Sequence, residues 1–161
     1  MDSQRQKSEI LTRWATLYHR EMFRFALFRL GSQSDAEDCV QELFLKLLQG
    51  TTSLSEVRSP RSFLLRSLAN HCIDMRRHRK ISLQPLAADL QSDDEPASID
   101  EPERINRLLA RLPDDQAEVI RMRTCDALSF AEIAEILEIP LPTAKSRFAY
   151  GIEKLRRIFH N

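Results

Sequence analysis

The amino-acid sequence predicts an all-α protein made of two small helical domains, and three observations carry that prediction. Apolar residues recur at intervals of three and four on both sides of the chain's middle, as they do in amphipathic helices. Alternating β-branched runs and the Asn-Gly or Asp-Gly turns of hairpins do not occur in the sequence. An acidic stretch at 82–102 without a periodic apolar pattern divides the 161 residues into two blocks.

The first block, residues 1–81, is predicted to be a domain of four helices. Its first helix is expected from about Gln6 to Leu30, ending before Gly31. An apolar face at near-helical intervals supports this helix and indicates the side that it buries. The residues of that face are Ile10, Trp14, Leu17, Phe25 and Phe28.

Capping residues mark two further helices of this block. Ser34 and Glu37 form a capping box at the start of the second helix, and Gly50 follows its end, where a left-handed C-cap is expected. The third helix begins with Ser59 as its cap and Pro60 in the first helical position. The apolar face of the second helix is Val40, Leu43, Phe44, Leu47 and Leu48, and that of the third is Phe63, Leu64, Leu68, Ile73 and Met75.

Residues 82–102 are predicted to be an acidic flexible linker. From residue 81 to residue 103 the chain holds seven acidic and no basic side chains, so like charges repel one another and extend it. Proline, serine and alanine make up much of the remainder, a composition that does not build a packed core. The acidic residues are Asp89, Asp93, Asp94, Glu95, Asp100, Glu101 and Glu103.

The second block, residues 103–161, is predicted to hold four shorter helices. The first runs from Glu103 to Arg111 and is closed by Pro113, and the second begins with Asp114 as its cap. The third spans 130–137 behind a capping box, and after a short break the fourth runs from about 142 to 159. The capping box consists of Ser129 and Glu132.

The last two helices have the pattern of a helix-turn-helix: a short helix, a tight turn and a longer basic helix. The small Ala134 allows the two helices to approach, and Ile136, Leu137 and Ile139 are expected to bury the turn. In this motif the start of the second helix enters a DNA major groove and contacts base edges. The polar residues near that start are Thr143, Lys145, Ser146 and Arg147, with Lys154, Arg156 and Arg157 placed further on for phosphates.

The formal net charge of zero hides a segregation of charge along the chain. Residues 1–80 hold 14 basic and 9 acidic side chains, a net of +5; residues 81–103 carry a net of −7; residues 104–161 hold 10 basic and 8 acidic, a net of +2. Within the first block the excess lies at 58–80, which has 7 basic residues against one acidic residue. Such basic blocks indicate a polyanionic partner such as nucleic acid.

Several classes of protein are disfavoured by the sequence. No apolar stretch approaches the roughly 18 residues of a membrane span, and no signal-peptide core follows the N-terminus, so a cytoplasmic protein without direct membrane insertion is expected. Three scattered Cys and four His show no metal-ligand spacing, so neither a metal nor a cofactor is expected. Nucleophile and phosphate-loop motifs are absent, and an enzyme is therefore not expected.

Three segments together resemble the extracytoplasmic-function sigma factors, the small promoter-recognition subunits of bacterial RNA polymerase. Residues 35–45 resemble the acidic segment of sigma domain two, and 62–77 resemble the segment of that domain that follows. Residues 112–113, 128–137 and 143–147 resemble sigma domain four. Residues 57–64 also look like the iron-starvation branch of the group.

The resemblance implies partners and site residues for the first domain. A face of the second helix is implied to dock on the coiled coil of the polymerase β′ subunit, and the β subunit is a further implied contact. The third helix is implied to meet the −10 element of promoter DNA, with Phe63 expected in the core. The docking residues are Asp35, Glu37, Asp38, Gln41 and Glu42; the −10 residues are Arg61, Asn70, Arg76, Arg77, Arg79 and Lys80.

For the second domain the resemblance implies recognition of the −35 element by the helix-turn-helix. Tyr150 and Gly151 stand where relatives often carry Arg and Ala, and a glycine inside a helix costs about 1 kcal/mol relative to alanine. Family members are usually held inactive by an anti-sigma factor, in many cases at the inner membrane. The implied −35 residues are Thr143, Lys145, Ser146, Arg147 and Tyr150.

Two other functions remain open on the sequence alone. A helix-turn-helix transcriptional regulator of the two-component type needs a β/α receiver domain, and the first block shows no strand signals. A non-catalytic adaptor or decoy for polymerase or an anti-sigma factor would keep the acidic face at 35–42 but would need no basic recognition helix. Reversal of the charges at Lys145 and Arg147 would then be harmless.

Overall fold

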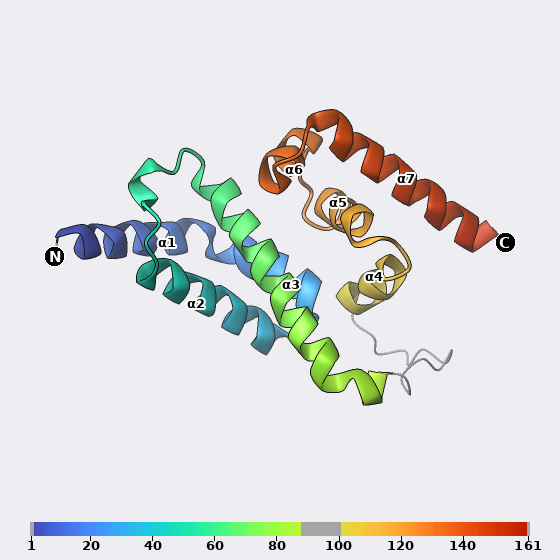
Figure 1. The fold of residues 1–161 in the computed structure, drawn as a ribbon, viewed down its shortest axis with the longest axis horizontal. Coiled ribbons are helices and arrows are strands. Elements are labelled where there is room, and N and C mark those ends of the chain that lie inside the picture. The colour runs from blue at the N-terminus through green and yellow to red at the C-terminus, as the bar shows by residue number, and fades with distance from the viewer. Residues whose placement is uncertain (1, 88–100, 161) are drawn as a thin grey trace. The chain divides into compact units, whose positions relative to one another are not determined.

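The computed structural model describes residues 2–87 and 101–160, and every regular element within these ranges is helical (Figure 1). The chain divides into two compact units, Met1–Asp100 and Glu101–Asn161. The predicted all-α, two-domain fold is therefore confirmed. Among the helices described, none combines the length and the hydrophobicity needed to cross a bilayer.

The first unit is built from α1 (Asp2–Leu30), α2 (Gln33–Gln49), the 3-10 helix η1 (Leu54–Glu56) and α3 (Pro60–Ala87). The long helix α1 packs against both α2 and α3, and these two also pack against each other. The sequence predicted four helices in this unit. The described residues hold the α-helices α1, α2 and α3, and η1 is a fourth helix only if its single turn is counted. Helix α3 continues to Ala87, into the segment that the sequence assigned to the linker.

The core of the first unit lies where α1 meets α2 and α3. Trp14, Phe25 and Leu64 are buried there, each contributing about 1.5–3 kcal/mol through removal of its side chain from water. Leu17 was expected on the same face but is 64% exposed. The buried stripe of α1 advances from Trp14 to Met22 by steps of four residues, which leaves Leu17 on the flank of the helix.

The boundary between α1 and α2 differs from the expectation. Gly31 adopts the left-handed region at φ 73°, and Ser32 then caps α2 by accepting a hydrogen bond from the Asp35 backbone N–H at 3.3 Å. The predicted cap Ser34 lies inside the first turn instead. Gly50 was also expected to be left-handed, but it follows α2 with extended backbone at φ −79° and ψ 179°.

The second unit contains the four expected helices, α4 (Glu101–Leu109), α5 (Asp114–Thr124), α6 (Phe130–Leu137) and α7 (Leu141–His160). Helix α7 packs against α5 and α6, and α5 also packs against α6. A buried apolar cluster joins the end of α4 and α5 to the core side of α7. Its members are Leu109, Leu112, Ala117 and Ile120, with Ile105, Phe148, Ile152 and Leu155 packed against them.

Capping geometry explains how the helix-turn-helix is formed. The predicted capping box of Ser129 and Glu132 is present at the start of α6, with both reciprocal hydrogen bonds. Glu138 ends α6 in the left-handed conformation at φ 56°. Pro140 precedes α7 and its carbonyl accepts a hydrogen bond from the Ala144 backbone N–H at 3.1 Å, but a proline side chain has no atom that can cap the helix. At α5 the capping position is taken by Pro113, and Asp114 is the first helical residue rather than the cap.

Gly151 is buried because α7 crosses α5 at close range. A Cβ atom added to this glycine would lie 2.5 Å from Cδ1 of Ile120 and 3.4 Å from Cβ of Gln116. Real Cβ atoms do not approach other atoms as closely as the first of these distances. At the glycine that looked unfavourable for a helix interior, the packing of α7 on α5 therefore leaves no room for a Cβ unless the end of the Ile120 side chain moves.

We expect Gly151→Ala to lower the free energy of unfolding by about 1 kcal/mol, because overpacking of about 1–3 kcal/mol outweighs the gain of about 1 kcal/mol in helix propensity. In an Ile120→Val background, which lacks Cδ1, the same step should instead be stabilising. Urea unfolding of wild type, Gly151→Ala, Ile120→Val and the double variant measures the effect of Gly151→Ala on the free energy of unfolding in both backgrounds. An equal loss in both backgrounds would contradict the proposed contact.

Candidate polymerase and nucleic-acid interfaces

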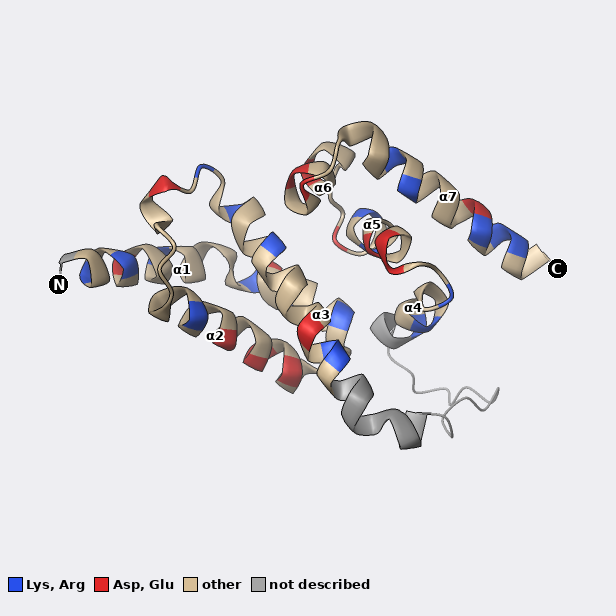
Figure 2. Ribbon diagram, in the orientation of Figure 1, with Lys and Arg blue, Asp and Glu red and all other residues tan. Residues whose placement is uncertain are grey.

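The exposed face of α2 carries the acidic residues that the sequence singled out. Glu37, Asp38, Gln41 and Glu42 are exposed, and Asp35 is half-buried in the first turn. Figure 2 shows acidic segments along α2, whereas basic segments mark α3. The spacing of three and four residues places most of these side chains on one side of the helix. Four of the five predicted docking residues are thus available to a partner.

Glu42 is tied to α3 through a buried histidine. Oε2 of Glu42 and Nε2 of His71 are 2.9 Å apart, and Nζ of Lys46 lies 3.3 Å from Nδ1 of the same ring. Because an ammonium group only donates hydrogen bonds, Nδ1 accepts, and Nε2–H therefore donates to Glu42. This network fixes the orientation of one predicted docking carboxylate, and sequence periodicity gave no sign of it.

Cys39 and Cys72 lie beside this network, with their Sγ atoms 3.5 Å apart and both side chains buried. The hydrogen bond with Cys72, together with burial, raises the pKa of the Cys39 thiol. The thiol rather than the thiolate is therefore the stable form, and the pair is a packing feature of the α2–α3 contact, not a nucleophile. Among the described residues no cluster of three His, Cys, Asp or Glu side chains could hold a metal ion.

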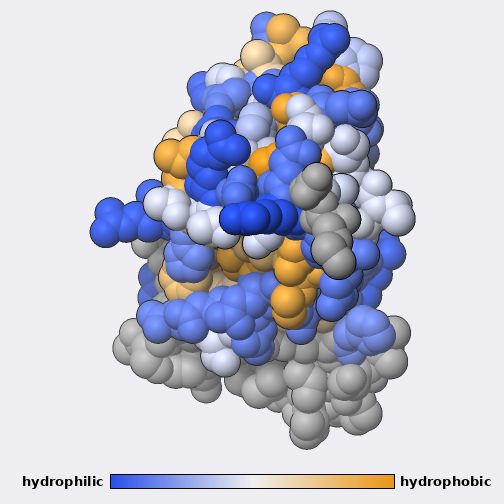
Figure 3. All heavy atoms as spheres, turned by 90° about the vertical axis from the view of Figure 1, so that its left-hand side faces the viewer, coloured by the Kyte–Doolittle hydropathy of each residue, from blue (hydrophilic) through white to orange (hydrophobic). Residues whose placement is uncertain are grey.

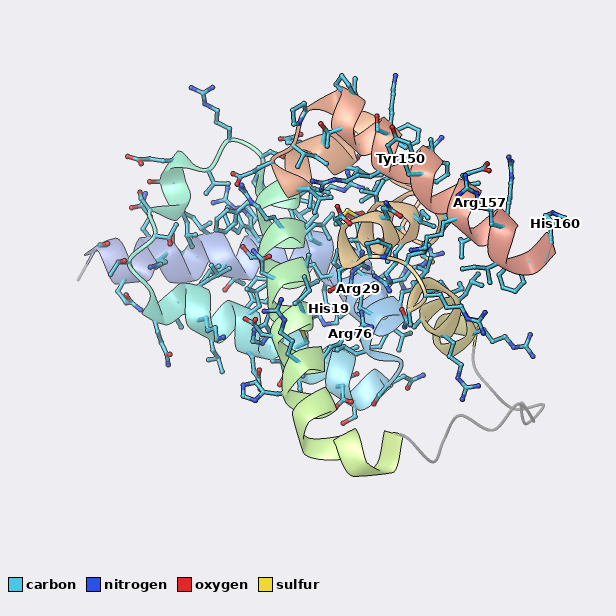
Figure 4. All side chains as sticks on the ribbon, turned by 45° about the vertical axis from the view of Figure 1, so that its right-hand side comes forward. His19, Arg29, Arg76, Tyr150, Arg157 and His160 are labelled. Atoms are coloured by element: carbon cyan, nitrogen blue, oxygen red, sulfur yellow. The ribbon has the colours of Figure 1, made fainter. Side chains whose placement is uncertain are left out.

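The residues predicted to meet the −10 element are spread along α3. Asn70, Arg76 and Arg77 are exposed, whereas Arg61 forms an ion pair with Glu21 of α1, with Nε and Oε1 separated by 2.6 Å. Arg76 is marked in Figure 4. The side chains of Arg79 and Lys80 lie outside the described residues. The exposed members thus begin in the middle of α3 and continue toward its C-terminal half.

Phe63, near the start of α3, contacts the core. Its ring centroid lies 6.1 Å from that of Trp14, with the two planes tilted by 58°. The side chain is half-buried rather than fully enclosed. Its position against Trp14 fits the expected core role more closely than that of an open stacking platform.

On α7 the predicted −35 residues divide into an outward row and an edge. Ser146 and Tyr150, together with Arg157, which was predicted to contact phosphates, fall on one exposed stripe at intervals of four and seven residues, with Tyr150 67% exposed. Figure 4 shows Tyr150, Arg157 and His160 following one another along this helix. Lys145 is also exposed, and Thr143 is half-buried. Part of the predicted set therefore faces solvent from the N-terminal half of α7.

Arg147 lies at the edge of α7 that borders α5. Its Nε is 3.6 Å from Oδ2 of Asp115, and the two side chains are 30% and 53% exposed. An ion pair with this exposure contributes about 0–1 kcal/mol to stability. Asp115 was not singled out from the sequence, because only the packing of α7 against α5 brings it near Arg147.

An arginine of α5, Arg123, was likewise not singled out from the sequence. Arg123 lies with its guanidinium carbon 4.9 Å from the centroid of the Phe130 ring, and its Nη1 donates to the Leu128 carbonyl at 3.1 Å. Phe130 in turn meets Phe148 edge to face at a centroid distance of 5.3 Å. These contacts fasten α6 to both α5 and α7.

An open groove of about 660 Å³ runs beside the outward row of α7. Its lining combines basic, acidic, polar and apolar side chains from α5 and α7: Gln116, Tyr150, Glu153, Lys154, Arg157 and Ile158. On the molecular face drawn in Figure 3, hydrophilic side chains predominate and apolar surface appears in small separate patches. The groove belongs to the basic surface of α7 and not to an enclosed pocket for a small molecule.

Known families match the two units in the order that the motifs indicated. Sigma-70 region 2 matches residues 14–81, and Sigma-70, region 4 matches residues 103–155. The chain is 29% identical over 157 residues to the ECF RNA polymerase sigma factor SigW of Bacillus subtilis, covering 88% of this chain and 84% of the relative. It is 31% identical over 142 residues to SigL of Mycobacterium tuberculosis, covering 84% and 80%.

A more distant relative and a solved structure extend these matches. The ferric citrate uptake sigma factor FecI of Escherichia coli is 25% identical over 133 residues, covering 78% of this chain and 76% of the relative. The fold is similar to that of the sigma factor RpoE of Bartonella quintana, solved with the anti-sigma factor NepR. The TM-score is 0.63 at 21% identity, with 92% of this chain and 96% of that one covered.

The matched regions contain the acidic face of α2 in the first unit and the helix-turn-helix of α6 and α7 in the second. Full-length relatives of the same class agree with both matches. The chain belongs to the extracytoplasmic-function sigma factors, the non-catalytic subunits that direct RNA polymerase to promoters.

Proposed function

We propose that three segments of this sigma factor have different functions. Residues 1–81 bind core polymerase and the −10 element, residues 82–102 connect the two domains, and residues 103–161 bind the −35 element. The observation that supports this best is the separation of charge: an acidic exposed face on α2 against basic exposed residues on α3 and α7. The acidic face suits a basic protein partner, and the basic residues suit phosphates.

For core binding, the proposed contact is the α2 face, with the coiled coil of the β′ subunit as its partner. Glu37 and Asp38 are exposed side by side on this face, while Glu42 is oriented by His71. Charges at the rim of an interface mainly change the association rate and its dependence on salt. The affinity for core polymerase should therefore be most sensitive to these residues at low ionic strength.

We expect Glu37→Lys combined with Asp38→Lys to weaken core binding by about 10- to 100-fold, because two attractive contacts become repulsive. Fluorescence anisotropy of the labelled full chain, titrated with core polymerase, measures the change. The matched control is Glu9→Lys with Glu56→Lys, which alters the net charge equally at exposed positions outside α2. Equal weakening by both pairs would show that net charge, and not the α2 face, controls binding.

For DNA, the proposed readers are the exposed residues of α3 and the N-terminal half of α7. Asn70, Arg76 and Arg77 would meet the −10 element, together with Arg79 and Lys80. Thr143, Lys145, Ser146, Arg147 and Tyr150 would meet the −35 element. Each bidentate base contact contributes about 1–3 kcal/mol of discrimination, so a few such residues define a promoter preference.

The test of the overall function is run-off transcription with purified core polymerase and a pool of genomic promoter fragments. Specific transcripts should require the added chain and should map to a small set of start sites. Core binding without specific transcripts would favour the adaptor or decoy. Absence of core binding would refute the proposed polymerase contact.

We further propose that an anti-sigma factor restrains this chain, in keeping with the complex in which the RpoE relative was solved. A membrane-linked antagonist would hold the sigma factor at the inner membrane until it is released. Affinity purification of the tagged chain from cells, before and after membrane removal, tests this restraint. Recovery of the chain free of any inhibitor under all growth conditions would contradict it.

We also propose membership of the iron-starvation branch, on the basis of residues 57–64 and the FecI relative. Under iron limitation, transcripts that depend on this chain should then rise. A deletion strain compared with its parent by transcript sequencing, with and without an iron chelator, measures this. An iron-independent set of transcripts would place the chain in another branch.

A further inference from the structure

Asp115 is held from two sides at the border between α5 and α7. Its Oδ1 accepts a hydrogen bond from the backbone N–H of Gln116 at 2.9 Å, and its Oδ2 lies 3.6 Å from Nε of Arg147. The carboxylate is therefore oriented by its own helix before it meets the arginine. Because both side chains are partly exposed, the pair adds little to folding stability.

The contact leaves the far end of the Arg147 guanidinium open. Nε is 3.6 Å from Oδ2 of Asp115, and within the described residues the structure shows no hydrogen bond from Nη1 or Nη2. Those two nitrogens form the planar fork that binds O6 and N7 of a guanine, or two phosphate oxygens, in a bidentate manner. A carboxylate beside Nε attracts the guanidinium electrostatically and favours a restricted set of orientations of that fork.

We infer that Asp115 is a positioning residue for DNA recognition, which holds Arg147 so that its fork reads one base pair of the −35 element. The inference rests on the proposed function of α7 and adds a residue of α5 to it. Without the carboxylate, the guanidinium is free to reach neighbouring bases and phosphates. The negative charge of Asp115 also repels phosphates, which disfavours DNA that does not supply the correct base.

The expected effect of Asp115→Asn is a loss of discrimination, not a loss of binding. Preference for one base pair should fall about tenfold, because the bidentate contact is no longer held in register. Affinity for unrelated duplex DNA should rise, since a negative charge near the phosphates has been removed. Asp115→Glu keeps the carboxylate and should retain most of the preference.

Asp114→Asn is the matched control, since it removes the same charge from the adjacent exposed residue of α5. Asp114 makes no ion pair with Arg147. This variant should raise the affinity for unrelated DNA to a similar extent while leaving base preference intact. The difference between the two variants isolates the contact with Arg147 from the general effect of charge.

The experiment forms holoenzyme from core polymerase and the full chain, then selects bound duplexes from a pool randomised across the −35 segment. Sequencing of the retained DNA gives the base preference at each position for wild type, Asp115→Asn, Asp114→Asn, Arg147→Lys and the Asp115→Asn/Arg147→Lys double variant. Arg147→Lys removes the fork, so adding Asp115→Asn should then cause no further change in base preference. Thermal unfolding midpoints of wild type and Asp115→Asn should coincide.

Three outcomes can be distinguished. Loss of preference at one position in Asp115→Asn alone supports the inference. Equal base preference of the Asp115 and Asp114 variants, or an effect of Asp115→Asn on base preference that persists in the Arg147→Lys background, overturns it. If wild-type holoenzyme enriches no sequence, the proposed −35 recognition itself fails, and the inference fails with it.

Discussion

Holoenzyme formed with Lys145→Glu/Arg147→Glu is expected to lose promoter-specific transcripts by about 100-fold or more, while its affinity for core polymerase is unchanged. Lys145 is exposed, and Arg147 borders α5 with its guanidinium partly exposed, both in the N-terminal half of α7. Reversing both charges removes two hydrogen-bond donors for bases and turns attraction to phosphates into repulsion. Both changes weaken the same complex with promoter DNA, so their effects on transcription multiply.

The measurement is run-off transcription from a promoter that wild type uses, together with anisotropy for core binding. Arg104→Glu/Arg111→Glu is the matched control, because it changes the net charge of the second unit equally at exposed positions outside α7. Full activity of the Lys145/Arg147 variant would show that these two residues of α7 are not needed for promoter recognition. Equal loss in the control would point to net charge alone.

Arg121→Met is expected to lower the free energy of unfolding of the second unit by about 3–5 kcal/mol. The arginine side chain is 4% exposed, and its Nε and Nη2 donate to Oδ1 of Asn106 at 3.1 and 2.8 Å. Nη1 donates to Oε2 of Glu118 at 2.9 Å. Methionine fills similar space but removes the three hydrogen bonds that Arg121 donates to Asn106 and to the largely buried carboxylate of Glu118. Since small domains are stable by only about 5–15 kcal/mol, this loss threatens the unit as a whole.

Urea unfolding followed by circular dichroism measures the loss. Trp14, the only tryptophan in the sequence, lies in the first unit, so its fluorescence transition should stay in place. Arg111→Met is the control, an exposed arginine whose removal should change stability by no more than about 0.5 kcal/mol. A change below about 1 kcal/mol for Arg121→Met would mean that water replaces the guanidinium at little cost.

Local sequence patterns were sufficient to predict the helices but not the contacts between helices. The capping box at Ser129 and the apolar spacing of α2 predicted their helices because both signals depend on residues within one turn or two. The helix ends were predicted less accurately: Ser32 and not Ser34 caps α2, and Gly50 has extended and not left-handed backbone. There the outcome depends on backbone conformation, and more than one nearby residue is chemically able to cap.

In the candidate sites, too, residue types on one helix could be predicted, whereas contacts between helices could not. The exposed acidic residues of α2 and the basic residues of α7 were evident from type and spacing. The pairs His71 with Glu42 and Asp115 with Arg147 were not, because each joins residues from different helices that only tertiary packing brings together. Gly151 was misjudged for that reason: propensity describes an isolated helix, whereas its environment is set by Ile120.

The buried cysteines offer a way to watch each unit open without introducing any label site. Cys39 and Cys72 are enclosed in the first unit and Cys125 in the second. A thiol-modifying reagent can reach such groups only during transient opening, so labelling rates resolved by peptide mass report the opening equilibrium of each unit separately. When the chain is bound to core polymerase or to an antagonist, the unit that the partner stabilises should open less often. The thiols of that unit should then react more slowly than in the free chain, which identifies the unit that the partner contacts.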